Sequence, residues 1–131
     1  MLSRWRGAVF GGVTFLGTHA VEAGAWGTWF APGVDHAAWF LNSGRAVALT
    51  VVCLFAVGAL NGAFGSADQR EALVRGAYFS GGAIVSMSVV LIVIGPGTLA
   101  PLAWLIGAVI VAKPGVSGAL VGWAIRRAHR Q

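Results

Sequence analysis

Three titratable side chains lie inside long apolar stretches of the chain, where ionisable groups are rare. His19 and Glu22 belong to the first stretch, and Lys113 belongs to the last. A charge at the centre of a lipid bilayer costs about 2.5–3.5 kcal/mol, so such side chains usually face protein or water and find a partner. His19 and Glu22 are three residues apart and therefore share one face of a helix. This chemistry suits proton or ion transfer or, through the His19 imidazole, axial ligation of a haem or chlorophyll-type pigment.

The composition predicts that lipid surrounds these residues. The chain has 131 residues, of which 57% are hydrophobic and 10% charged, whereas a soluble domain carries about 25% charged residues. The mean hydropathy is +0.79. A soluble domain this small could not bury so much apolar surface. We therefore predict a single polytopic membrane domain over residues 1–131, all-α in class.

Four apolar stretches are long enough to form transmembrane helices. A helix rises about 1.5 Å per residue, so about 20 residues cross a hydrocarbon core about 30 Å thick. The predicted spans cover residues 8–30, 45–64, 74–94 and 102–125. Between the first two spans, residues 35–42 predict a short helix that lies in the membrane interface.

Local signals predict where these helices start and how they bend. Ser66–Gln69 has the form of a capping box, which places a helix start at Ala67. Glu71 and Arg75 are four residues apart and are expected to pair. Pro114 removes a backbone donor and Gly115 adds freedom, so a break is predicted in the middle of the fourth span.

Small residues recur four apart along the spans, as in Gly7/Gly11 and Gly58/Gly62. Small-xxx-small pairs allow the backbones of two membrane helices to approach closely, so these faces predict tight helix–helix packing. The serines of the third span are expected to hydrogen-bond back to their own helix rather than to form a site.

Cations predict the orientation of the four spans. The termini and the second loop carry seven arginines that would lie on one side: Arg4, Arg6, Arg70, Arg75, Arg126, Arg127 and Arg130. The opposite side carries only Arg45. The positive-inside rule then places both termini in the cytoplasm, with the bacterial inner membrane as the expected location. The net charge of +5 is thus explained by topology, and nucleic acid is not an expected partner.

Depth along the spans predicts a partner for Glu22. Glu22 lies about 21 Å from the inner end of the first span, and Lys113 lies about 14 Å from the inner end of the fourth. A long lysine side chain can nearly close a gap of roughly 7 Å. We therefore expect the first and fourth spans to be neighbours, joined by a Glu22–Lys113 ion pair that fixes helix register or serves transport.

The sequence contains no motif with metal-ligand spacing, no nucleophile elbow and no phosphate-binding loop. The leading expectation is a non-catalytic accessory subunit of a larger membrane complex, respiratory or photosynthetic for example. Small-residue faces on every span exceed what four helices alone need.

Two alternatives stay open. One is a proton- or ion-coupled transporter or channel, acting as a homo-oligomer through Glu22 with His19 and Lys113. The other is a subunit that binds haem or a chlorophyll-type pigment through His19.

Overall fold

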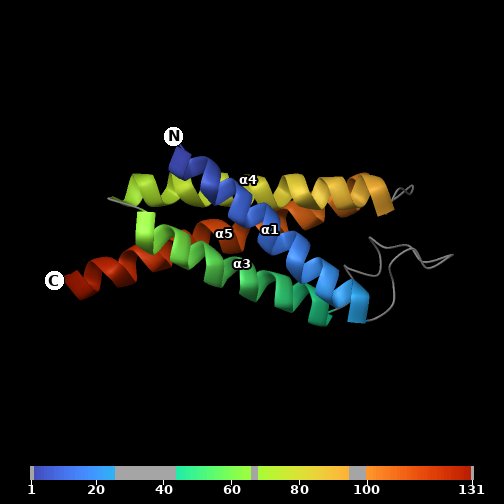
Figure 1. The fold of residues 1–131 in the computed structure, drawn as a ribbon, viewed down its shortest axis with the longest axis horizontal. Coiled ribbons are helices and arrows are strands. Elements are labelled where there is room, and N and C mark those ends of the chain that lie inside the picture. The colour runs from blue at the N-terminus through green and yellow to red at the C-terminus, as the bar shows by residue number, and fades with distance from the viewer. Residues whose placement is uncertain (1, 26–43, 66–67, 95–99, 131) are drawn as a thin grey trace.

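The computed structural model describes residues 2–25, 44–65, 68–94 and 100–130, and this part of the chain is helical apart from the residue that precedes the third helix (Figure 1). Its helices are α1 (Leu2–Ala25), α3 (Gly44–Gly65), α4 (Gln69–Ile94) and α5 (Ala100–Arg130). The all-α class is therefore confirmed. The short interfacial helix predicted at residues 35–42 lies outside the described residues.

Three of the four helices are long and apolar enough to cross a membrane. They are Gly44–Phe64 in α3, Gln69–Ile92 in α4 and Trp104–Arg130 in α5. The 24-residue α1 is not among them; Arg4 and Arg6 lie in its first turns, and His19 lies within its apolar stretch. These three helices support the interpretation of the chain as a helical membrane protein.

The helices α1 and α5 extend beyond the predicted spans at their arginine-rich ends. α3 matches the predicted span 45–64 within one residue at each end, but α1 starts at Leu2 rather than residue 8 and α5 continues to Arg130 rather than residue 125. Arginine is a good helix former, so the helices continue through the basic residues that flank the apolar stretches. Hydropathy locates the part that suits lipid and underestimates the length of the helix.

The start of α4 depends on Asp68. The backbone N–H of Glu71 donates to Asp68 Oδ1 over 2.7 Å, and the N–H of Ala72 donates to the Asp68 carbonyl over 3.0 Å. α4 therefore begins at Gln69 with Asp68 as its N-cap; the helix start predicted at Ala67 lies outside the described residues. The predicted pair between Glu71 and Arg75 is confirmed, with Arg75 Nε 3.2 Å from Glu71 Oε1.

Successive helices run in opposite directions along the bundle (Figure 1). The two largest interfaces join α3 to α5 and α1 to α4; α4 also packs on α5, and α1 packs less extensively on α3. α1 and α5 make at most marginal contact. The expectation that the first and fourth spans are neighbours is therefore wrong, because matching the depths of two charges does not determine which helix faces pack together.

Glycines determine the closest helix pairs. A Cβ atom added to Gly82 of α4 would collide with the Ala8 carbonyl of α1. On the other side of the bundle, a Cβ on Gly62 would collide with Ala119 of α5, and one on Gly122 with the Ala59 carbonyl of α3. The predicted close approach at Gly58 and Gly62 is confirmed, and it joins α3 to α5.

Each helix contributes a large side chain to one core. Phe15 of α1, Leu54 of α3, Phe79 of α4 and Val111 of α5 are all at most 1% exposed. Large apolar side chains also cover much of the outside of the bundle, on all four helices. That outer surface suits a hydrocarbon surround, whereas water would not solvate it.

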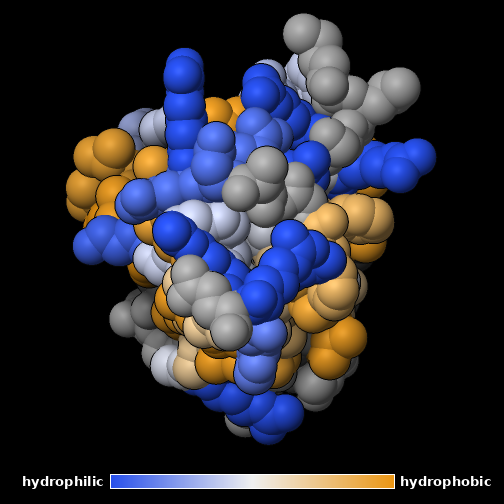
Figure 2. Space-filling model, turned by 90° about the vertical axis from the view of Figure 1, so that its left-hand side faces the viewer, coloured by the Kyte–Doolittle hydropathy of each residue, from blue (hydrophilic) through white to orange (hydrophobic). Residues whose placement is uncertain are grey.

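All seven arginines of the predicted inner side lie at one end of the bundle, which we call the basic end: Arg4, Arg6, Arg70, Arg75, Arg126, Arg127 and Arg130. The start of α1, the end of α3, the start of α4 and the end of α5 meet there (Figure 1). Figure 2 looks onto this end and shows hydrophilic residues gathered over it. The segregation of charge that the sequence predicts is thus present in the fold.

Candidate functional site

His19 is buried in the bundle. Its side chain is 3% exposed, and its ring stacks on Phe15, with 5.6 Å between ring centroids and 17° between ring planes. Both residues lie on the face of α1 that is directed at the core, because four residues make about one helical turn. A haem or chlorophyll-type ring bound at His19 would have to displace the side chains that cover the imidazole. The packed site therefore does not fit an axial ligand without rearrangement.

Glu22 lies in the last turn of α1, and its side chain is outside the part that the structure describes. Lys113, its predicted partner, is exposed on α5. Because α5 packs on α3 and α4 rather than on α1, the structure does not bring Lys113 together with His19. The two candidates whose side chains are described therefore lie apart, with His19 in the core and Lys113 on the outside of α5.

Lys113 lies in the middle of an exposed stripe on the outer face of α5. The stripe has the three- and four-residue spacing of one helix face. Its members are Leu102, Ile106, Val109, Lys113, Ser117 and Val121. Lys113 is 13 residues from both Ala100 and Arg126, which corresponds to about 19 Å in either direction. Among the described residues, no carboxylate forms an ion pair with it.

Pro114 and Gly115 are buried, and the chain stays helical through them as part of α5; the kink expected at this place stays a prediction. Ser80 Oγ of α4 donates to the Ala112 carbonyl over 2.9 Å, close to the proline. A Cβ added to Gly115 would collide with Ser80 Oγ. Contacts from neighbouring helices allow membrane helices to tolerate proline, and this segment is a packing joint between α4 and α5.

The third-span serines behave differently from one another. Ser88 Oγ donates to the Ile84 carbonyl of its own helix over 2.8 Å, as predicted. It also accepts a hydrogen bond from Trp104 Nε1 of α5 over 2.7 Å. Ser80 bonds to another helix instead, so for Ser80 the prediction is wrong. Both residues connect α4 to α5.

An ion-pair network joins three helices at the basic end. Arg4 of α1 is 3.0 Å from Glu71 of α4, and Arg75 contacts the other oxygen of the same carboxylate. Asn61 of α3 donates to the Arg75 carbonyl over 3.5 Å. The sequence predicts the pair within α4 but gives no signal for Arg4, which is 67 residues from Glu71.

The network also shifts the pKa values of Glu71 and Arg4. The Arg4 guanidinium, by its hydrogen bond and then its charge, holds the pKa of the Glu71 carboxyl below its ordinary value, although partial burial acts in the opposite sense. The same hydrogen bond raises the pKa of Arg4. Both groups lie in the first turns of their helices, ahead of the spans that the sequence predicts at residues 8–30 and 74–94. Glu71 is thus a permanently charged structural anchor near neutral pH.

We expect Glu71→Gln to lower the thermal stability of the chain at neutral pH. Because the pKa of Glu71 is depressed in the folded state, its contribution is present above the unfolded pKa and is lost as the pH falls through the folded one. Circular dichroism melts in mild detergent across a pH series measure this. The stability difference from wild type should shrink on acidification, whereas the exposed control Arg70→Gln should show no such trend. A Glu71→Gln difference that is constant with pH would contradict the assignment.

The chain matches no protein-family model, and no curated protein or solved structure is detectably similar to it. Within the described residues, no group of three histidine, cysteine or acidic side chains could hold a metal ion. The functional interpretation therefore depends on the geometry above, and most of all on the outer face of α5.

Proposed function

We propose that the chain is a four-span protein of a bacterial inner membrane, with both termini in the cytoplasm, and that it is a non-catalytic subunit of a larger membrane assembly. Two features support the topology. α1 has 24 residues, which is enough to cross a hydrocarbon core of about 30 Å. The arginines gather at one end of the bundle, as the positive-inside rule requires.

The outward position of Lys113 is the observation that carries the proposed assembly. A lysine side chain can reach the interface only from positions near the ends of a span, and Lys113 is about 19 Å by helical rise from both Ala100 and Arg126. Facing lipid, its charge would cost about 2.5–3.5 kcal/mol. A second membrane chain with a carboxylate at the same depth removes that cost.

The partner therefore has a stated chemistry: a transmembrane helix with an acidic side chain at mid-depth, packed on the α5 stripe. Leu102, Ile106 and Val109 on one side of Lys113 and Val121 on the other supply apolar contact area along it. A second copy of this chain, contributing Glu22, is the homo-oligomeric form of the same arrangement. A transporter in which His19 and Lys113 share one path within a single chain receives less support, because the two residues lie on helices that hardly touch.

The experiment is extraction from native membranes in a mild detergent, followed by native gel separation and an absorption spectrum of the band. We expect the chain to migrate in a discrete complex larger than itself, with co-migrating subunits that identify the process. A small colourless oligomer of this chain alone would contradict the accessory role and favour transport. A coloured band would instead support the alternative in which His19 binds a haem or a chlorophyll-type pigment.

A further inference from the structure

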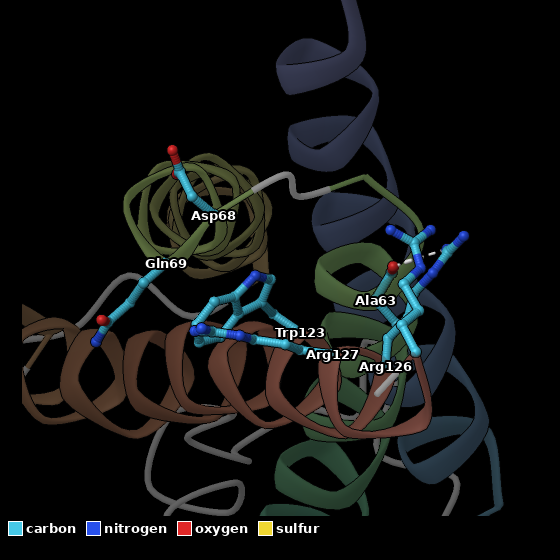
Figure 3. Close-up of a pocket in the computed structure, with 7 residues that line it drawn as sticks. Ala63, Asp68, Gln69, Trp123, Arg126 and Arg127 are labelled. Atoms are coloured by element: carbon cyan, nitrogen blue, oxygen red, sulfur yellow. Dashed lines mark hydrogen bonds between the residues drawn. The ribbon is translucent and has the colours of Figure 1, made fainter.

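A cavity of about 470 Å³ opens at the basic end, where the end of α3, the start of α4 and the end of α5 meet (Figure 3). Its volume lies in the usual range for small-ligand sites. Its lining combines cationic, amide and aromatic groups. The lining residues are Ala63, Asp68, Gln69, Trp123, Arg126, Arg127 and Arg130.

Two of the arginines are held in place by neighbouring groups. Arg126 donates from one guanidinium nitrogen to the Ala63 carbonyl over 2.8 Å, and its guanidinium lies 5.0 Å from the centre of the Phe64 ring. Arg127 lies over the Trp123 ring at 5.4 Å. A guanidinium has five N–H donors, and stacking on an aromatic ring occupies none of them. Arg127 therefore keeps its donors for a ligand.

The charge around the cavity is positive. Three arginines and a single carboxylate, that of Asp68, line it, and this carboxylate already accepts the N–H of Glu71 at the start of α4. In Figure 3 the Asp68 side chain points away from α5, whereas Trp123 and Arg127 lie side by side on the α5 surface. Gln69 adds an amide donor, and the start of α4 adds the positive end of a helix dipole.

We propose that this cavity binds the phosphate of an anionic phospholipid headgroup from the cytoplasmic leaflet. The proposal rests on the topology of the proposed function, which places Trp123 at the interface and the arginines at headgroup level. Guanidinium groups bind phosphate oxygens in a bidentate manner. Basic pockets between transmembrane helices on the cytoplasmic side are suited to such headgroups.

An arginine that only satisfies the positive-inside rule needs neither a cavity nor an aromatic ring that holds it in place. The positive-inside rule and the dipole at the end of α5 both favour arginines here, and Arg70 satisfies the rule as an exposed residue outside the cavity. Arg127 and Arg130 instead line a concave site. The site therefore predicts selectivity for the headgroup and not only a general attraction to negative surfaces.

The test uses the full chain in a mild non-ionic detergent. Thermal unfolding is followed with added phosphatidylglycerol, with phosphatidylcholine at the same mole fraction, or with inorganic phosphate at the same ionic strength. We expect phosphatidylglycerol alone to raise the midpoint by a few degrees, because a ligand that binds only the folded state stabilises it. The double variant Arg127→Gln, Arg130→Gln should need about tenfold more phosphatidylglycerol for half of the effect.

Arg70→Gln is the matched control, because it removes one charge from the same end without touching the cavity. It should keep the full response. An equal loss in Arg70→Gln, or an equal response to phosphatidylcholine, would overturn the proposal, and an equal response to inorganic phosphate would show a free-anion site instead.

If the double variant fails to fold, the wild-type response decides. The rise in midpoint with phosphatidylglycerol should decline with added NaCl, and a rise that persists at high salt would contradict the ion pairing. Native gel migration tests the subunit role separately, so an intact complex without lipid selectivity refutes only this inference.

Discussion

Gly122→Ala is expected to destabilise the bundle by about 1–3 kcal/mol, the usual range for forcing extra volume into a packed contact. The new Cβ would collide with the Ala59 carbonyl of α3. That obstacle is backbone, so α3 and α5 must move apart along their shared interface, which is one of the two largest in the fold.

Gly17→Ala is the matched control for this substitution. Gly17 lies in α1, and nothing lies within 4 Å of the place that a Cβ added there would occupy. Alanine exceeds glycine in helix propensity by about 0.8–1.0 kcal/mol. The control should therefore be neutral or stabilising, opposite in sign to Gly122→Ala. Both are measured by denaturation of the detergent-solubilised chain with SDS, followed by circular dichroism. Equal effects of the two substitutions would contradict the close α3–α5 packing.

Local signals in the sequence predict the parts of the fold that depend on local physics. Apolar length predicts where the helices lie, and the four-residue spacing of Gly58 and Gly62 predicts a close helix contact. The Glu71–Arg75 pair is also local, and it forms. Each of these predictions uses residues of one helix only, so the sequence of that helix is enough to make it.

Partner choice between helices is what the sequence does not reveal. Depth matching suggests that the first and fourth spans are neighbours, whereas steric complementarity at Gly82 and Gly122 pairs α1 with α4 and α3 with α5. The contacts of Arg4 with Glu71 and of Ser80 with Ala112 depend on that pairing. So does the outward direction of Lys113, because only the packed bundle shows which face of α5 remains uncovered.

Lys113→Met is expected to dissociate the proposed assembly. If a partner carboxylate faces Lys113, methionine leaves that carboxylate buried without a counter-ion, which costs about 3–5 kcal/mol. At about 1.4 kcal/mol for each tenfold change, the affinity should fall by roughly two to four orders of magnitude. Lys113→Arg keeps the charge and should retain much of the complex on native gels, which makes it the matched control.

The opposite outcome has a clear meaning. If Lys113 faces lipid without a partner, Lys113→Met removes a charge that costs about 2.5–3.5 kcal/mol at the bilayer centre. The substitution would then leave native gel migration unchanged. It would also increase the stability of the chain in reconstituted membranes. The proposed assembly predicts instead that the substitution abolishes the complex.

The most direct measurement is photo-crosslinking from the α5 stripe in native membranes. A benzophenone amino acid replaces Val109, one turn from Lys113, or Val52 on the exposed face of α3 as a control position. The proposed assembly predicts one discrete protein adduct from position 109 that disappears in the Lys113→Met background and returns with Lys113→Arg. An adduct that does not depend on Lys113, or crosslinks to lipid alone from both positions, would contradict it.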